Sequence, residues 1–365
     1  MRRWIAGSAT VLAATAGLAA TAGLAATAGL AATGPAMASS TSWSQVLQVN
    51  RAGSFTQIAA ISKADVWAVG DLWDSKGNAI YQPLIRHYAG GEGWSTVTIP
   101  GAPRFSSDQV TASAANDVWV VGLTPGTVAH SMAYRFDGSR WHKIPVPAKT
   151  YLQGTLALNP DNVWAFGSSA TIFAPGSSVS ASVFHWNGAR WRGYNLANGN
   201  LMPESISASG TRNVWIAGSV WTHSAYRAEA FRWNGSAWHN SGLPRVLTDE
   251  PGVSAIAPSN VWVGWNTQTA SRSLHWNGRR WLPQSVPDNL IANTSNVVPD
   301  GQGGYWFGGF AILAGGAWTS VPWIGVTGGA GPVYRIPGTE SFLQPATVKN
   351  SGSAIQRPTI YRYDL

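Results

Sequence analysis

Acidic side chains are the residues of this sequence that could perform acid–base chemistry on a sugar. In glycoside cleavage one carboxyl group donates a proton while a second acts as base or nucleophile. Six acidic residues fall in predicted loops between strands: Asp71, Asp74, Glu204, Glu229, Asp249 and Glu250. We expect these loops to share one face of the fold, but their spacing singles out no pair. Acidic loop residues are more often solvated than catalytic, so an extracellular hydrolase or lyase acting on polysaccharide is the alternative interpretation.

Four other side chains are the candidate ligand-binding residues: Trp73, Trp221, His223 and Trp265. Trp73 and Trp221 each follow a repeated Val-Trp pair by six residues, at the start of a predicted loop. Flat aromatic rings bury a large area and anchor interfaces, and they stack on the apolar faces of sugar rings. Alternatively, these rings cap the end of the fold against neighbouring loops. Noncatalytic glycan binding through loops at one face is therefore the preferred interpretation.

Histidines and cysteines indicate no metal or redox site. The chain contains no cysteine, so it has no disulfide and no thiolate for catalysis or metal binding. His87, His185 and His275 occupy one repeated position, so we expect them to lie far apart and to serve the structure. The sequence predicts neither a metal nor a cofactor.

Two motifs alternate along the chain and must build the elements that position these residues. The first is an apolar strand of the form Asx-Val-Trp-x-x-Gly, as in "DVWAVG" at 65–70, which recurs in seven strong or weak copies. The second is an aromatic hairpin that closes on a tryptophan, as in "FRWNGSAW" at 231–238. The tryptophans at these two repeated positions are expected to be structural: Trp43, Trp67, Trp94, Trp119, Trp141, Trp164, Trp191, Trp215, Trp238, Trp262, Trp281, Trp306 and Trp318.

The spacing of the repeats predicts the architecture. Closing tryptophans recur every 37 to 51 residues, and periods of about 40 to 50 residues are typical of propeller blades. Trp43 resembles a closing tryptophan without its hairpin, and "IYRYDL" at 360–365 resembles the missing limb. We therefore expect an all-β, seven-bladed β-propeller of four-stranded antiparallel blades, in which the N-terminal strand completes the last blade. Six blades is the alternative, because the unit at 282–318 is short.

Local composition predicts how each blade is built. The first strand is rich in Ala and Ser, as expected where strands converge on a central axis. The Asp or Asn before each Val-Trp is expected to bond nearby backbone N–H groups. Asn-Gly pairs, such as Asn187-Gly188, predict type I′ hairpins. The tryptophan after each pair is expected to be buried against the neighbouring blade.

This order of strands and turns resembles the kelch repeat and the central propeller of the galactose oxidase superfamily, over nearly all of the chain beyond the N-terminal leader. The glycine doublet typical of kelch units appears only as Gly308-Gly309. Arrays of "DVWAVG" and "WNGxxW" are also similar to secreted actinobacterial propeller proteins of unassigned activity. The copper radical chemistry of galactose oxidase requires a cysteine, so that activity is excluded for this chain.

The N-terminus predicts export. Arg2 and Arg3 precede an uncharged stretch that ends at Ala36-Met37-Ala38. This pattern predicts a signal peptide over 1–38, cleaved between Ala38 and Ser39, with the Sec or Tat route undecided; an uncleaved membrane anchor is the alternative. Residues 39–365 are then expected to form a single secreted propeller domain, monomeric and without a stable membrane span.

The charge of the chain bears on its partners. The net charge is +8, but the basic residues are scattered rather than gathered in a stripe, which argues against nucleic acid. A mild positive excess favours anionic cell-wall polymers or serves solubility. The expected partner is therefore a glycan, a cell-wall polymer or another extracellular protein.

Overall fold

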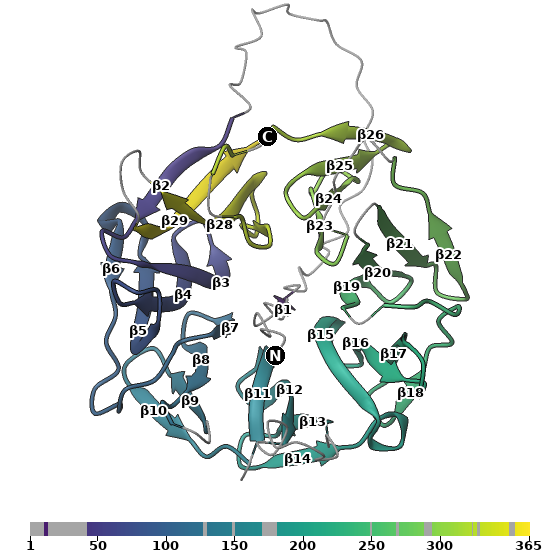
Figure 1. Ribbon diagram of the computed structural model, residues 1–365, viewed down its shortest axis with the longest axis horizontal. Coiled ribbons are helices and arrows are strands. Elements are labelled where there is room, and N and C mark those ends of the chain that lie inside the picture. The colour runs from purple at the N-terminus through teal and green to yellow at the C-terminus, as the bar shows by residue number, and fades with distance from the viewer. Residues whose placement is uncertain are drawn as a thin grey trace, which may run out of the picture.

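The computed structural model describes residues 11–13, 42–126, 130–147, 150–169, 181–248, 250–267, 270–287, 294–322, 324–326, 329–349 and 355–365. Ala38, Ser39 and Asp249, which the sequence singled out, lie outside these ranges. The first described segment, β1 (Val11–Ala13), lies in the middle of the ring and pairs in parallel with β15 (Figure 1). No helix in the described part of the chain has the length and apolarity needed to cross a membrane.

Seven blades, each with four antiparallel strands, stand around a common axis, and in blade 4 the parallel strand β1 is added to the sheet as a fifth strand (Figure 1). The chain is a seven-bladed β-propeller. In the first six blades the strands follow one another from the axis outwards in chain order.

The strands of the first three blades have the following bounds. Blade 1 contains β3 (Gly53–Ser62), β4 (Asp65–Trp73), β5 (Ala79–Tyr88) and β6 (Trp94–Thr96). Blade 2 contains β7 (Gln109–Ala114), β8 (Asp117–Leu123), β9 (Ser131–Phe136) and β10 (Trp141–Ile144). Blade 3 contains β11 (Thr150–Asn159), β12 (Asn162–Ser169), β13 (Ala181–Trp186) and β14 (Trp191–Tyr194).

The next three blades repeat this plan. Blade 4 contains β15 (Leu201–Gly210), β16 (Asn213–Trp221), β17 (Tyr226–Trp233) and β18 (Trp238–Asn240). Blade 5 contains β19 (Gly252–Ala257), β20 (Asn260–Asn266), β21 (Ser271–Trp276) and β22 (Trp281–Gln284). Blade 6 contains β23 (Val297–Pro299), β24 (Tyr305–Phe307), β25 (Ala311–Ala314) and β26 (Ala317–Ser320).

Both ends of the described chain build blade 7. It contains β27 (Tyr334–Arg335), β28 (Ser341–Lys349), β29 (Gln356–Asp364) and, outermost, β2 (Ser44–Gln48), which pairs antiparallel with β29. The Trp43 ring lies 5.3 Å from the Tyr363 ring and 6.1 Å from the Trp306 ring, centroid to centroid. The predicted count of seven blades and the predicted closure are confirmed. The short unit at 282–318 still forms a complete blade because its strands are only three or four residues long.

Tryptophans link the blades through near-perpendicular contacts. The second-strand rings Trp67, Trp119, Trp164, Trp215, Trp262 and Trp306 are at most 3% exposed. The closing ring of the next blade meets several of them edge-on: Trp119 and Trp191 are 6.2 Å apart at 76°, and Trp215 and Trp281 are 5.7 Å apart at 86°. Such geometry is favourable for aromatic pairs.

The closing tryptophans themselves are less buried than the sequence suggested. Trp43, Trp94, Trp141, Trp191, Trp238 and Trp318 are only partly buried, whereas Trp281 is buried. The reason is their position on the outer strand, where one side of the ring faces the circumference of the propeller. The second-strand rings therefore contribute most of the tryptophan burial.

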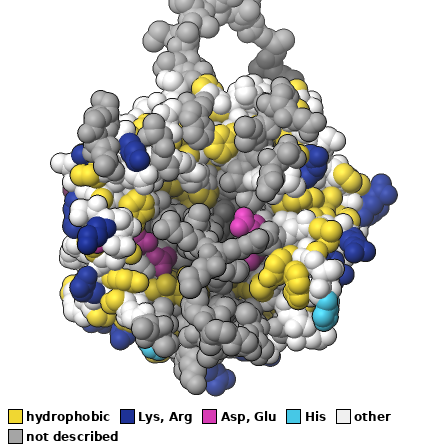
Figure 2. Space-filling view, viewed as in Figure 1, with side chains coloured by type: hydrophobic (Ala, Val, Ile, Leu, Met, Phe, Trp, Pro, Cys, Tyr) yellow, Lys and Arg dark blue, Asp and Glu magenta, His cyan; other side chains and the backbone are white. Residues whose placement is uncertain are grey.

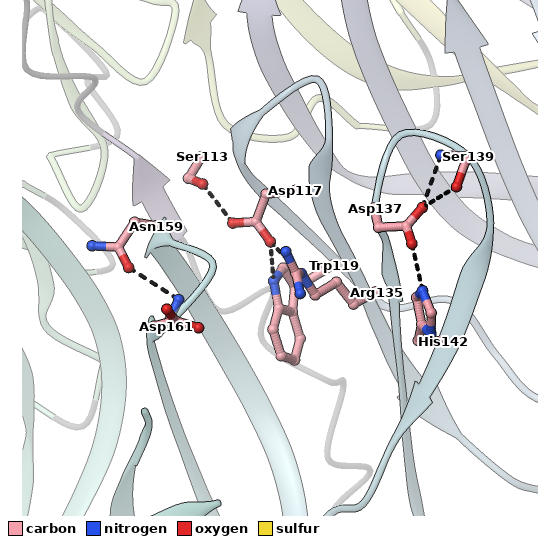
Figure 3. Close-up of polar contacts among 9 residues, drawn as sticks. All are labelled: Ser113, Asp117, Trp119, Arg135, Asp137, Ser139, His142, Asn159 and Asp161. Atoms are coloured by element: carbon pink, nitrogen blue, oxygen red, sulfur yellow. Dashed lines mark hydrogen bonds and ion pairs between the residues drawn. The ribbon is translucent and has the colours of Figure 1, made fainter. Parts of the chain in front are cut away.

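In blades 1 to 5 the Asp or Asn that begins the second strand bonds side chains rather than the nearby backbone N–H groups that we expected. In blade 2 the fully buried Asp117 accepts hydrogen bonds from the indole of Trp119 at 3.0 Å and from the guanidinium of Arg135 at 2.7 Å (Figure 3). In blades 1, 3 and 5 a histidine replaces Arg135, in the pairs His87–Asp65, His185–Asn162 and His275–Asn260. These contacts fasten the second strand to the third.

The Asn-Gly turns are not type I′ hairpins, so that expectation was wrong. Four residues, Asn187 to Arg190, separate the paired ends of β13 and β14, and Gly188 has φ of 89° whereas Asn187 is not among the residues with positive φ. The Asn187 side chain instead accepts the backbone N–H groups of Ala189 and Arg190. Asp137 plays the same part in blade 2 (Figure 3). The first residue of the pair is selected as an acceptor, not for a left-handed backbone.

Inner strands are also joined from blade to blade by side-chain hydrogen bonds. The Thr111 hydroxyl on β7 accepts the N–H of Ala157 on β11 at 2.9 Å, and the Ser207 hydroxyl on β15 accepts the N–H of Ala255 on β19 at 2.9 Å. Small hydroxyl residues near the axis therefore fit the narrow space and also satisfy backbone groups of the next blade.

Candidate functional site

Asp71 and Asp108 come from adjacent blades and meet at their junction. Asp71 lies near the end of β4 in blade 1, and Asp108 immediately precedes β7 in blade 2. Their carboxyl groups are within hydrogen-bonding distance of each other, and both residues are partly buried. Two carboxylates in such contact repel each other, so the pair favours a state in which they share one proton.

Hydrogen bonds from three neighbours hold this acidic pair in place. The backbone N–H of Ser107 donates to Asp71, and the Ser106 hydroxyl donates to Asp108 at 2.9 Å. The Thr56 hydroxyl donates to the backbone carbonyl of Asp108 at 2.8 Å. Thr56 is the extra residue of a β-bulge in β3, and bulges commonly redirect side chains beside functional sites.

Burial and mutual repulsion change the protonation of this site. Burial, followed by the charge of Asp71, raises the pKa of Asp108 to about 7. Burial also raises the pKa of Asp71, although hydrogen bonds from Asp108 and Ser107 oppose that change. At the start of β11 in blade 3, burial and then the charges of Asp108 and Asp71 raise the pKa of Tyr151 to about 12. A carboxyl group whose pKa is near neutrality is suited to proton transfer at ordinary pH.

The other predicted acids within the described ranges do not join this pair. Asp74 accepts the backbone N–H groups of Lys76 and Asn78 in the turn after β4. Glu204 lies at a β-bulge in β15, Glu250 is exposed before β19, and Glu229 lies on the outer part of blade 4. The sequence identified Asp71 but missed Asp108, because nothing in the spacing of the two residues shows that their blades bring them together.

A groove runs around the outer part of blade 4. One hollow of about 710 Å³ lies between β14 of blade 3 and the strands β17 and β18. A second hollow of about 500 Å³ lies between β17 and residues 243–247. Arg227, Glu229 and Asn240 line both hollows, which together we call the blade 4 groove.

The groove exists because β17 changes its partner halfway along. Residues 231–233 pair with β18, whereas Arg227 forms a bridge with Leu247 and the Ala228 N–H donates to the Val246 carbonyl at 2.9 Å. The Ser241 N–H still donates to the Ala230 carbonyl at 2.9 Å, and the following residues 242–245 leave the edge of the sheet. The space that they leave beside β17 is the smaller hollow.

An aromatic wall and a set of polar groups line the larger hollow. The ring centroids of Tyr194 and Trp233 are 5.6 Å apart, and those of Trp233 and Trp238 are 5.8 Å apart. Glu229 forms an ion pair with Arg227 and accepts a hydrogen bond from the Asn240 amide at 3.1 Å. Pockets that combine aromatic surface with a few fixed polar groups are typical small-ligand sites.

The turn that borders the larger hollow is strained. Ala197 and Asn198 follow one another with φ of 50° and 55°. Non-glycine residues in this left-handed region cost about 1 kcal/mol or more each, and such strain concentrates at functional sites. Both residues line the larger hollow.

The boundary between blades 3 and 4 also lacks a hydrogen bond that other boundaries have. Trp191, Trp281 and Trp318 each donate their indole N–H to a backbone carbonyl of the preceding blade, at 2.9 to 3.2 Å. The corresponding N–H of Trp238 is buried and has no partner in the described part of the chain. The groove therefore lies at a boundary that lacks the indole hydrogen bond found at several others.

The predicted ligand-binding residues come from three different blades. Trp73 is in blade 1, Trp221 and His223 are in blade 4, and Trp265 is in blade 5. Trp221 is 51% exposed, and its ring centroid lies 4.9 Å from that of Tyr226. His223 is exposed with φ of 70°, whereas Trp73 and Trp265 are partly buried. None of the four lines the blade 4 groove, so their binding role stays a prediction.

Charged side chains are unevenly distributed over the surface. On the face shown in Figure 2, acidic side chains lie near the middle and Lys and Arg lie nearer to the rim. Among the residues that the structure describes, no group of three or more His, Asp or Glu side chains is placed to hold a metal ion.

Comparisons with known proteins show the fold. No family model matches the chain, and no curated protein matches it in sequence. It is similar to the structure of YCF48 bound to a D1 peptide, with 15% identity and a TM-score of 0.56 over 91% of this chain and 97% of that one. This likeness shows the β-propeller fold and supports no particular superfamily within it.

Two more distant structures share the general architecture. A fucose-recognising six-bladed propeller lectin of Aleuria aurantia has 14% identity and a TM-score of 0.43 over 83% of this chain and 94% of that one. An ulvan lyase, a polysaccharide lyase of family PL25, has 11% identity and a TM-score of 0.43 over 65% of this chain and 70% of that one. Both are too distant to add to the argument on function.

Proposed function

We propose that this protein is a secreted, noncatalytic, kelch-like propeller that binds carbohydrate in the blade 4 groove. The observation that carries the proposal is the larger hollow, where Tyr194, Trp233 and Trp238 adjoin the polar groups of Glu229 and Asn240. Aromatic faces stack on the C–H faces of a pyranose, while carboxylate and amide groups bond its hydroxyls. The strained turn at Ala197 and Asn198 supports this assignment because such strain concentrates at functional sites.

Two substitutions in the groove test the proposal. Asn240→Ala removes a polar group of the groove, and Asn198→Gly removes an amide while retaining a residue that tolerates positive φ. Each is expected to weaken glycan binding about tenfold, the effect of losing one hydrogen bond of roughly 1.4 kcal/mol. Screening on a glycan array, followed by calorimetric titration of the best ligand, measures the change.

Trp221→Ala is the matched control, because Trp221 belongs to the same blade but does not line the groove. If the groove holds the ligand, the binding of this variant should equal that of the unsubstituted protein. If Trp221→Ala abolishes binding and both groove variants bind normally, the ligand is held at the loop face and the groove proposal is wrong.

A second function, acid–base catalysis on a polysaccharide, is favoured by one observation, the contact between Asp71 and Asp108. Glycosidases need two carboxyl groups about 5 Å apart or more, on either side of the scissile bond. Carboxyl groups that contact each other are too close for that arrangement. The pair would instead serve as one acid or base, as a lyase requires to remove a proton from its substrate.

Product release from a panel of polysaccharides tests this second function. Asp108→Asn and Asp71→Asn should each lower turnover about 100-fold, the usual effect of losing a general acid or base. The control is Asp74→Asn, which removes an exposed carboxylate from the same blade. Absence of product from every polysaccharide, or equal turnover by all four proteins, would contradict catalysis at this pair.

A further inference from the structure

We infer that the blade 4 groove selects an anionic sugar polymer, whose carboxylate or phosphate groups bind Arg192 at one end and Arg245 at the other. This inference rests on the proposed carbohydrate function and assigns its ligand class. The side chains that line the two hollows carry it.

The groove has an excess of positive charge. Arg192, Arg227 and Arg245 line it, and Glu229 is the one acidic residue among the described residues that do so. Glu229 pairs with Arg227, so these two charges neutralise each other. Neither Arg192 nor Arg245 forms an ion pair within the described part of the chain. Two positive charges are therefore left for a ligand.

The remaining charges lie in different hollows. Arg192 lines the larger hollow, where its guanidinium carbon is 5.0 Å from the centroid of the Tyr194 ring. Arg245 lines the smaller hollow and is exposed. The two hollows are separated by three residues that line both of them, Arg227, Glu229 and Asn240. A ligand that contacts both arginines must cross this polar divider, which suits a chain of sugar units better than a single unit.

Guanidinium groups are well suited to this task. The planar fork of arginine matches the oxygens of a carboxylate or a phosphate with two parallel hydrogen bonds. The Tyr194 ring under Arg192 restricts the side chain, which reduces the entropy lost on binding. The Arg227–Glu229–Asn240 cluster adds neutral hydrogen-bonding groups between the two cations for the hydroxyls of the polymer.

The overall charge favours the same ligand. The chain carries a net charge of +8, which attracts polyanions. Acidic side chains gather near the middle of the face in Figure 2, so they disfavour a polyanion there. The groove is bordered by β17 and β18, which lie on the outer side of blade 4, away from the axis (Figure 1).

Binding assays with matched polymers test the inference. The full chain is titrated, at one fixed ionic strength, with polygalacturonate, with the same polymer after its carboxyl groups are reduced to alcohols, and with a polysaccharide whose sugar units are joined by phosphodiester groups. The anionic polymers should bind at least about tenfold more tightly than the reduced polymer. The tighter of the two identifies carboxylate or phosphate as the preferred anion.

Charge-removing variants locate the site. Arg192→Gln and Arg245→Gln should each weaken binding of the anionic polymer about tenfold, with unchanged thermal unfolding. Arg190→Gln is the matched control, because Arg190 is an exposed turn residue that lines neither hollow and its replacement removes the same charge. It should change binding by less than about twofold.

Each contrary result has a separate meaning. If the reduced polymer binds as tightly as polygalacturonate and Asn240→Ala weakens both, the charge preference is overturned and the carbohydrate function stands. An equal loss in all three arginine variants would show attraction by overall charge and would also overturn the inference. If no polymer and no array glycan binds, the proposed function fails together with it.

Discussion

Trp119→Ala is expected to lower the free energy of unfolding by about 3 to 5 kcal/mol, the range for a large buried aromatic replaced by alanine. The Trp119 side chain is 0% exposed and packs edge-on against Trp186 at 6.0 Å and Trp191 at 6.2 Å. Its indole N–H also donates to the buried Asp117 at 3.0 Å, so the substitution removes one partner of a buried carboxylate. Urea denaturation followed by circular dichroism measures the change.

Two other tryptophans give the comparison that makes this result informative. Trp191→Ala should cost less, about 1 to 2 kcal/mol, because the Trp191 ring is only partly buried and less apolar surface is lost. Trp221→Ala should change stability by less than about 0.5 kcal/mol, because Trp221 is exposed. Equal losses at Trp119 and Trp221 would mean that the second-strand rings do not hold the blades together.

Asp108→Asn is expected to stabilise the protein above neutral pH and to leave it nearly unchanged in acid. Burial and the charge of Asp71 raise the pKa of Asp108 to about 7 in the folded protein. Between about pH 4 and pH 7 the unfolded chain loses this proton while the folded protein retains it, so the stability of the unsubstituted protein falls as pH rises. The asparagine side chain does not ionise, so the variant avoids this loss of stability. Its amide still donates a hydrogen bond to Asp71.

Thermal unfolding at about pH 4 and about pH 8 tests whether Asp108→Asn stabilises the protein at the higher pH alone. At the higher pH the variant should melt at least about 3 °C above the unsubstituted protein, and at the lower pH the two should agree. Asp74→Asn is a control, because the contribution of Asp74 to stability should depend on pH in the opposite direction. Hydrogen bonds from Asn78 lower the pKa of Asp74, so its contribution to stability is present near neutrality and is lost in acid. A destabilising effect of Asp108→Asn at the higher pH would show that the two carboxyl groups do not repel each other.

The propeller was predictable because the sequence pattern that produces one blade repeats along the chain. Each blade needs a small inner strand, an apolar second strand and an aromatic hairpin, and seven copies of that order are visible in the sequence. The halves of the split repeat, at Trp43 and at 360–365, predicted the closure because neither half can complete a four-stranded sheet alone. Turn geometry was less predictable, since the Asn187 side chain accepts backbone N–H groups where a left-handed backbone was expected.

The candidate sites were less predictable because they arise where the repeats differ. Asp108 contacts Asp71 only through the relative placement of two blades, and no motif links the two residues. The blade 4 groove depends on β17 changing its partner and on the strained turn at Ala197 and Asn198, which have no counterpart in the repeat pattern. Periodicity therefore predicts the scaffold, while departures from periodicity produce the sites.

The pairing of β2 with β29 has a consequence for how the molecule is made. These strands are separated by about 300 residues, and a contact that closes so long a segment forms slowly because of its loop entropy. The four antiparallel strands of each of blades 1 to 6 are neighbours in the sequence, so these blades can assemble during synthesis, while the seventh blade must wait for residues 356–364. Until then the molecule is an open arc with unpaired sheet edges, and this is the stage at which chaperones or aggregation would intercept it.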